Sequence, residues 1–282
     1  MSVKNKVQLI TYPNSLGRDL KELRSVLDGM LKGLFDGGVH ILPPFPSSGD
    51  RGFAPIDYFE IEKAFGTWED IINISRNHDV VIDLMVNHIS RQSEYFRDFL
   101  NNGDDSRYKD LFITLDKIWD GGMPVKEDID KIFLRRELPY SEYTVKGGQT
   151  IKLWTTFGKT DPSEQIDVDI HSETAKEFFR NILRNFSFNG VKIVRLAAIG
   201  YVIKKRGTSC FFVEPEIYEF LNWISGVARQ YDLVLLPEVH AHHSIQYKLA
   251  ARGYWIYDFI LPYRILEALL LKRFDSLGEY LK

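Results

Sequence analysis

Short apolar runs that alternate with amphipathic helical segments are the feature that most restricts the fold of this chain. Strand-like runs occur at 6–12, 38–44, 80–88, 191–196, 233–239 and 254–261. Segments with apolar residues at i, i+3 and i+4 spacing lie between them and predict helices over 20–31, 67–75, 172–188 and 215–229, with a last helix from about Arg264. Strand and helix alternate with short connections, which favours a parallel α/β architecture.

Local signals support these elements. Thr67 and Asp70 have the spacing of a capping box at a helix start. The helix over 172–188 is followed by Asn189-Gly190, a typical C-terminal stop. The run 80–88 is apolar enough to be buried on both faces, as the strands of a parallel sheet are.

Residues 89–165 interrupt the alternation, because they are polar and weakly periodic and contain "NNGDDSRYKD" and "VKGGQT". We predict a first part of a catalytic barrel over 1–88, an inserted domain over 89–165, and a continuation of the barrel over 166–282 that is incomplete at its C-terminus. A doubly wound sheet is the alternative. The barrel is favoured because no glycine-rich phosphate loop follows the first strand, and polar residues follow several successive strands.

These polar residues are expected to meet at one barrel mouth. They are Asp50, His88, Arg195, Glu238 and His240. Taken singly, most have an ordinary structural explanation, such as a turn aspartate or a core histidine. Arg195 is the exception, because a guanidinium inside an apolar strand requires a carboxylate or phosphate partner.

The residue types favour carbohydrate chemistry. Carboxylates, histidines and an arginine are accompanied by the aromatic side chains Phe53, Phe157 and Tyr201, which can form the walls of a sugar site. The histidines of the 240–243 stretch lack the fixed geometry of a metal site, so no metal is predicted.

The composition excludes other classes of function. Lys and Arg number 36 against 39 Asp and Glu, a net charge of −3 that gives no electrostatic case for nucleic acid or an anionic membrane as partner. Cys210 is the single cysteine, which fits a reducing compartment. No secretory signal opens the given sequence and no apolar stretch approaches the roughly 20 residues of a membrane span. We therefore expect a soluble, cytoplasmic protein.

Several long motifs resemble one known family. "GVHILPPFPSSGDRGFAPIDY", "DLMVNHIS", "VKIVRLAAIGYVIKK", "GTSCFFVEPEIYEF" and "LPEVH" are similar to the sucrose phosphorylase subgroup of glycoside hydrolase family 13. Sucrose phosphorylases and sucrose 6F-phosphate phosphorylases match these motifs equally well. The resemblance implies a (β/α)8 TIM barrel with a domain inserted after strand three. Since six strands are predicted, the last two strands lie beyond the given sequence.

The resemblance also implies roles for individual residues. The nucleophilic aspartate of the family falls on Ala197, and the general acid/base falls on Glu238. Asp50, His88, Arg195 and His240 fall on glucose-subsite or supporting positions, and Phe53, Phe157 and Tyr201 on its walls. Arg135 and Arg136 fall near where family members bind phosphate or acceptor groups. The stretch 159–167 is expected near the site without an assigned role.

The implied reaction is phosphorolysis of sucrose, or of sucrose 6F-phosphate, to α-glucose 1-phosphate and fructose, or fructose 6-phosphate, without a cofactor. A methyl group at position 197 cannot attack an anomeric carbon, so little or no activity is expected, whether Ala197 is engineered or natural. An α-glucosidase-type hydrolase, a non-catalytic sugar-binding pseudoenzyme and a barrel fragment without a function of its own remain alternatives. A homodimer is compatible with the sequence.

Overall fold

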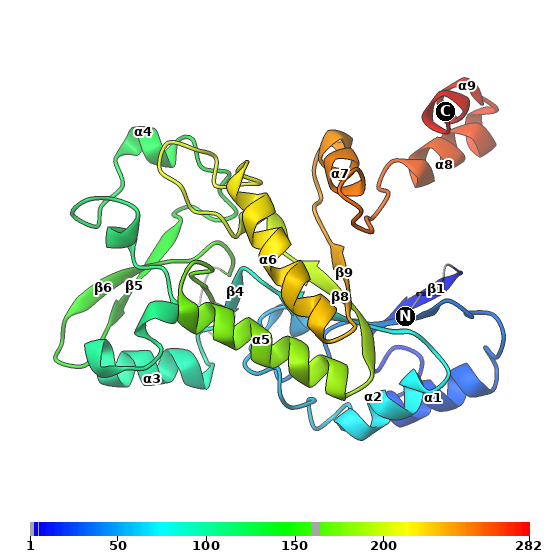
Figure 1. The fold of residues 1–282 in the computed structure, drawn as a ribbon, viewed down its shortest axis with the longest axis horizontal. Helices are drawn as coiled ribbons and strands as arrows, with labels where there is room; N and C mark the ends of the chain where they lie inside the picture. Colours follow the sequence, from blue (N-terminus) through cyan, green and yellow to red (C-terminus); the bar gives the residue numbers. More distant parts are fainter. Residues whose placement is uncertain (1–2, 5, 159–163) are drawn as a thin grey trace.

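The computed structural model describes residues 3–4, 6–158 and 164–282. A parallel sheet forms its centre, with the strand order β1-β2-β3-β8-β9 (Figure 1). Its strands are β1 (Gln8–Thr11), β2 (Gly38–Ile41), β3 (Val80–Met85), β8 (Val191–Ala197) and β9 (Val234–Pro237). Because every neighbouring pair is parallel, the carboxyl ends of all the strands lie along one edge.

Burial is greatest in the middle of the sheet. Every residue of β3 is buried, as expected for a strand covered on both faces. β3 pairs with β8 in a register that sets Asp83 opposite Arg195 and Met85 opposite Ala197. At the β1 edge, by contrast, Ile10 is exposed.

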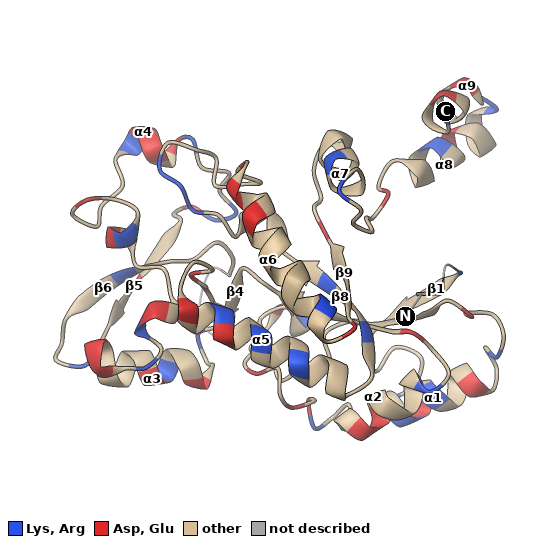
Figure 2. Ribbon diagram, viewed as in Figure 1, with Lys and Arg blue, Asp and Glu red and all other residues tan. Residues whose placement is uncertain are grey.

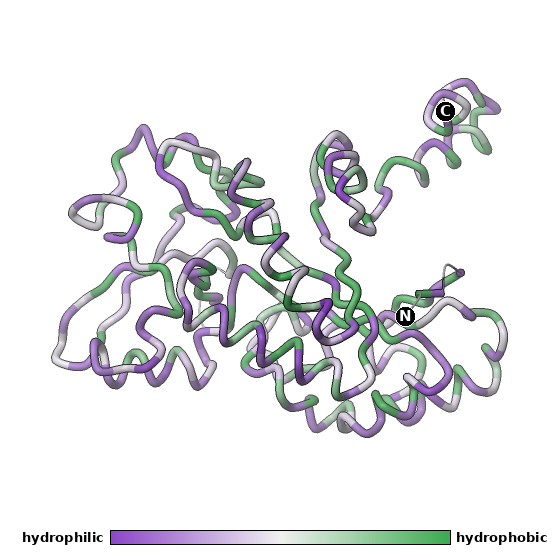
Figure 3. The backbone as a smooth tube through the Cα atoms, in the orientation of Figure 1, coloured by the Kyte–Doolittle hydropathy of each residue, from purple (hydrophilic) through white to green (hydrophobic). Residues whose placement is uncertain are grey.

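Four helices lie between these strands along the chain. They are α1 (Leu20–Asp28), α2 (Trp68–Ser75), α5 (Glu173–Phe188) and α6 (Glu216–Gln230). Hydrophobic and hydrophilic residues alternate along α5 and α6 (Figure 3), and their apolar sides are buried. The capping box that Thr67 and Asp70 predict is present at the start of α2. Leu31 lies beyond the end of α1, which stops at Asp28.

An aromatic cluster ties the loop after β2 to the rest of the core. The ring of Phe45 stacks on that of Phe186 in α5 at a centroid distance of 5.7 Å. The hydroxyl of Tyr58 accepts a hydrogen bond from the backbone N–H of Met85 at the end of β3, with an N–O distance of 3.1 Å. These contacts fix the loop that carries Asp50 and Phe53 against the end of β3.

The chain leaves the sheet after β3 and returns before α5. The excursion contains α3 (Glu94–Asn102), α4 (Lys126–Ile129) and the hairpin of β5 (Tyr140–Thr144) and β6 (Thr150–Trp154). Its two ends, β4 (His88–Ser90) and β7 (Gln165–Asp167), pair antiparallel with His88 opposite Asp167. The division into 1–88, 89–165 and 166–282 stays a prediction, and both of its boundaries fall within these two strands.

The prediction of a sixth strand over 254–261 is wrong, so the described sheet has five strands. Residues 254–260 form no regular element, and the carboxylate of Asp258 accepts hydrogen bonds from the backbone N–H groups of Ile260 and Leu261. This carboxylate satisfies amides at the start of a helix, α8 (Leu261–Leu271), which begins earlier than predicted. Two further helices, α7 (His243–Ala250) and α9 (Asp275–Tyr280), were not predicted.

Several helices carry charges of both signs. Figure 2 shows Lys and Arg interspersed with Asp and Glu on α1, α3 and α5. Among the described residues no helix combines the length and the apolar character needed to cross a membrane.

Candidate active site

A cavity of about 290 Å³ lies at the carboxyl ends of β3, β8 and β9. It brings together nearly all of the residues singled out in the sequence. These are Asp50, Phe53, His88, Arg135, Phe157, Arg195, Ala197, Tyr201, Glu238 and His240. Residues separated by up to 190 positions in the chain therefore share one cavity, as the convergence of parallel strand ends requires.

Ala197 and Glu238 lie at the ends of adjacent strands. Ala197 is the last residue of β8, and Glu238 follows the last residue of β9. The backbone N–H of Glu238 donates to the carbonyl of Leu196, with an N–O distance of 3.1 Å. Beyond Ala197 the backbone turns through Ala198, which has a left-handed φ of 58°. The turn leads the chain away from the sheet and toward Tyr201.

Arg195 has the partner that its buried position requires. One arm of the guanidinium contacts a carboxylate oxygen of Asp83, and the other lies 3.4 Å from Oε1 of Glu238. Burial alone would lower the pKa of Arg195, but the two carboxylates outweigh burial and raise it. The guanidinium therefore remains charged between a fully buried acid and a cavity-lining acid.

Aromatic rings flank the same guanidinium. The Arg195 Cζ atom lies 5.7 Å from the ring centroids of both Phe53 and Tyr257, within cation–π distance. Burial raises the pKa of Tyr257 to about 12, although Arg195 opposes the shift. Tyr257 thus stays a neutral phenol at the back of the site.

His88 is buried and is held at both ring nitrogens. Its Nε2 donates to the carbonyl of Phe53 at 3.0 Å, and its Nδ1 accepts from the amide of Asn87 at 3.4 Å. Burial lowers the pKa of His88 below the ordinary value of 6.5. The site therefore presents a neutral imidazole at neutral pH.

The expected aromatic wall is present and is wider than predicted. Phe157 packs against His88 and against Tyr201, at centroid distances of 5.2 and 5.0 Å. Tyr201 in turn packs edge-on against Phe211 at 4.9 Å, and Phe211 contacts Phe133 at 5.1 Å. Apolar faces such as these suit the C–H faces of a sugar ring.

A buried ion pair lies next to this wall. Lys204 Nζ is 2.7 Å from Asp167 Oδ2, with both side chains almost fully buried. The ammonium also donates to Asn87 Oδ1 at 2.9 Å, to Thr156 Oγ1 at 3.2 Å and to the carbonyl of Tyr201. The ammonium therefore links Asn87, which precedes His88, and Thr156, which precedes Phe157, to the backbone of Tyr201.

Asp50 and His240 also line the cavity. Asp50 lies in a Gly-Asp-Arg-Gly turn with a left-handed φ of 54°, a conformation that aspartate tolerates better than most residues. The imidazole of His240 packs against Phe259 at a centroid distance of 5.0 Å. His243, at the end of the histidine-containing stretch 240–243, begins α7.

The two adjacent arginines have different surroundings, and the prediction that both lie near a phosphate or acceptor group stays a prediction. Arg135 lines the cavity, whereas Arg136 does not. The guanidinium of Arg136 bonds Glu164 at 3.1 Å, Thr155 at 2.9 Å and Ser141 at 3.1 Å. Burial opposes ionisation of Glu164, but hydrogen bonds from Ser141, Tyr143 and Arg136 outweigh burial and lower its pKa. Arg136 therefore has a structural role inside the inserted segment.

Comparison with known proteins agrees with this geometry. Residues 13–261 match the family model described as the alpha-amylase catalytic domain. The chain belongs to the alpha-amylase family.

Two curated proteins of this kind are similar over the whole chain. A sucrose 6(F)-phosphate phosphorylase from Thermoanaerobacterium thermosaccharolyticum is 61% identical, and a sucrose phosphorylase from Streptococcus mutans is 43% identical. All of this chain aligns in both cases, and it spans 58% of the length of each of these relatives.

Solved structures share the fold of this chain. The crystal structure of sucrose 6F-phosphate phosphorylase from Thermoanaerobacter thermosaccharolyticum superposes with a TM-score of 0.96 and 61% identity, covering all of this chain and 57% of that one. An isomaltulose synthase mutant from Erwinia rhapontici NX5, 21% identical, shares the fold with a TM-score of 0.72, over 92% of this chain and 49% of that one. The predicted barrel fold class is confirmed for this alpha-amylase family member.

Seven residues that line the cavity had no role assigned from the sequence: Met85, Phe133, Gln165, Ala198, Gly200, Phe211 and Val239. The two aromatic residues sit in loops with no periodic signal. Gln165 is 2% exposed, and among the described residues its Oε1 has no hydrogen-bond partner. Of the stretch 159–167, to which no role was assigned, residues 159–163 lie outside the described residues.

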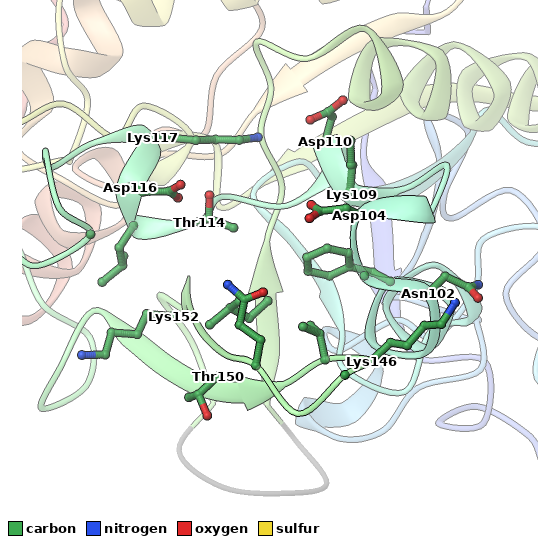
Figure 4. A pocket seen from close by; sticks show the side chains of 18 of the residues that line it. Asn102, Asp104, Lys109, Asp110, Thr114, Asp116, Lys117, Lys146, Thr150 and Lys152 are labelled. Atoms are coloured by element: carbon green, nitrogen blue, oxygen red, sulfur yellow. The ribbon is translucent and has the colours of Figure 1, made fainter.

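A larger hollow of about 880 Å³ in the inserted segment of this alpha-amylase family member is not the site (Figure 4). Its lining alternates lysines with aspartates. Lys117 is paired with Asp169 at 2.7 Å, and Lys152 with Glu142 at 3.4 Å. The charged groups do not converge on a common point there. No cluster of three or more metal-binding side chains was found in the described ranges 3–4, 6–158 and 164–282.

Proposed function

We propose that this chain carries the sugar site of a retaining disaccharide phosphorylase, which transfers glucose from sucrose or sucrose 6F-phosphate to inorganic phosphate. The observation that carries the proposal is the single cavity in which Arg195, Ala197 and Glu238 meet His88 and an aromatic wall. The similarity to named phosphorylases over the whole chain supports the same reaction. No cofactor is required by this chemistry.

Two carboxylates on adjacent strand ends would perform the reaction. In the first step a carboxylate at position 197 attacks C1 while the C1–O bond to the fructosyl group breaks, and Glu238 gives its proton to the leaving oxygen. In the second step a phosphate oxygen attacks C1, the bond to the carboxylate breaks, and Glu238 takes the proton from phosphate. Two inversions give α-glucose 1-phosphate.

In this chain Ala197 would remove the nucleophile while leaving the sugar site in place. The methyl group has no electron pair to form the covalent intermediate, so turnover should fall by a factor on the order of 10⁴ or more. Ground-state binding rests on the other cavity residues and should persist. A cytoplasmic location and a homodimeric state also remain proposals.

We favour sucrose 6F-phosphate as the natural substrate. The relative named for that substrate is more similar, at 61% identity, than the one named for sucrose, at 43%. Arg135 lines the cavity and is a suitable partner for a phosphate group. Because Arg136 is paired with Glu164, it does not add to that charge.

The test restores the missing nucleophile. Ala197 and Ala197→Asp proteins are each joined to the C-terminal part of the 61% identical relative, because the chain spans only 58% of that protein. We expect glucose 1-phosphate from the Asp protein alone, faster from sucrose 6F-phosphate than from sucrose. Free glucose without phosphate would instead indicate a hydrolase, and absence of product from correctly folded Asp protein would refute the phosphorylase proposal.

Ala197 itself favours a second candidate, a sugar-binding protein that does not turn over its ligand. Calorimetry separates the two candidates. The second predicts sucrose or sucrose 6F-phosphate binding to the Ala197 chain, and still no product after Ala197→Asp.

A further inference from the structure

A row of polar side chains runs across β2, β3 and β8 to the end of β9 and reaches the cavity. It starts at His40 on β2, continues through Asp83 on β3 and Arg195 on β8, and ends at Glu238 after β9. His40 Nε2 lies 2.9 Å from Asp83 Oδ2, and Arg195 contacts the other oxygen of Asp83. Arg195 then reaches Glu238 across 3.4 Å.

The two residues of the row that line the cavity are more exposed than the other two. The side chains of His40 and Asp83 are 3% and 0% exposed, those of Arg195 and Glu238 15% and 23%. The carboxylate of Asp83 therefore has no access to solvent, and both its oxygens must be satisfied by protein donors. An ionised carboxylate only accepts hydrogen bonds, so His40 Nε2 is the donor in the first contact.

The two carboxylate oxygens of Asp83 bond different donors, and this affects how many N–H groups of Arg195 bond Asp83. A guanidinium prefers to hold a carboxylate with two parallel N–H bonds, one to each oxygen. His40 bonds one oxygen of Asp83 and so competes with Arg195 for it, which disfavours that arrangement. The second arm of Arg195 is then available to Glu238.

We propose that His40 is a positioning residue of the site, which keeps Arg195 shared between Asp83 and Glu238 by engaging one oxygen of Asp83. Without this donor, Arg195 would turn both arms to Asp83 and leave Glu238. Other titratable groups that face the row are Tyr58 beside Asp83, Tyr257 beside Asp83, Arg195 and Glu238, and Tyr201 beside Glu238. The proposal rests on the proposed function only for the role of Glu238.

Crystal structures of two variants of residues 1–282 test it without any turnover, so its failure is distinguishable from failure of the phosphorylase proposal. In His40→Leu we expect the Arg195–Glu238 separation to exceed the limit of about 4 Å for an ion pair. In His40→Gln, whose amide N–H can replace Nε2, the contact should stay. An unchanged contact in His40→Leu, or a lost contact in His40→Gln, would overturn the proposal.

A double-mutant cycle gives a second readout that simple loss of packing would not produce. His40 and Glu238 have no direct contact, so independent roles predict that the melting shifts of His40→Leu and Glu238→Gln add. Coupling through Arg195 predicts that the shift of the double variant differs from the sum, and additivity would refute it. Should His40→Leu not fold, His40→Met, which also lacks a donor, answers both questions.

Discussion

Removing the ammonium of Lys204 should destabilise the protein more than removing almost any other lysine. Lys204→Met leaves the fully buried carboxylate of Asp167 without its counter-ion. Removing one partner of a buried ion pair costs about 3–5 kcal/mol. Asp167 keeps hydrogen bonds from Asn87 Nδ2 at 3.0 Å and from the Thr156 N–H at 2.9 Å, so we expect the lower end, about 3 kcal/mol.

The measurement is thermal unfolding of residues 1–282 followed by circular dichroism. A loss of about 3 kcal/mol corresponds to a melting shift of roughly 6–12 °C, at about 2–4 °C per kcal/mol for a large domain. Lys248→Met is the matched control, because Lys248 forms an ion pair with Glu214 at 2.8 Å but both side chains are exposed. An exposed pair contributes about 0–1 kcal/mol, so the control should shift little.

A third variant tests the cause. Asp167→Asn in the Lys204→Met background removes the uncompensated charge and should recover part of the lost stability. The reasoning would be refuted by a Lys204→Met protein that unfolds within about 1 kcal/mol of the Lys248→Met control. It would also be refuted if Asp167→Asn destabilised the Lys204→Met protein further.

Three further predictions concern single residues. Because the pKa of His88 is lowered in the folded protein, the unfolded chain binds a proton at this residue first as the pH falls, and stability should fall as the pH drops below about 6.5. The melting temperature should therefore depend less steeply on pH between pH 5 and 7 in His88→Gln than in the unchanged protein. An equal slope of melting temperature against pH in both proteins would contradict this. Arg136→Met should cost about 1–3 kcal/mol by leaving Glu164 with Arg91 as its remaining ion-pair partner, with little effect on sugar affinity measured by calorimetry; weaker sugar binding at unchanged stability would show instead that Arg136 belongs to the site. Gln165→Leu removes a buried oxygen that lacks a partner among the described residues, so stability should hold while sugar affinity falls about fivefold, the equivalent of about 1 kcal/mol; calorimetry showing unchanged affinity would exclude Gln165 as a sugar contact.

The adjacent arginines show where reasoning from the sequence stops. Arg135 and Arg136 have the same chemistry and neighbouring positions, and the sequence offers no reason to separate them. In the folded chain, Arg136 finds Glu164, 28 positions away, while Arg135 lines the cavity. Both residues lie in an irregular, bent segment before β5, so only the surrounding structure selects what each side chain contacts.

The sequence by itself determined the strand and helix alternation, the capping box at Thr67 and the family motifs, because these depend on short-range periodicity and local hydrogen bonds. It also indicated that residues at successive strand ends would meet. Tertiary structure alone decided that Arg195 is shared between Asp83 and Glu238, and that residues 254–260 do not form a strand. Asp83 and Arg195 are 112 positions apart, and a strand requires a neighbour to pair with. Both outcomes depend on which distant segments come together, and local sequence patterns carry no record of that.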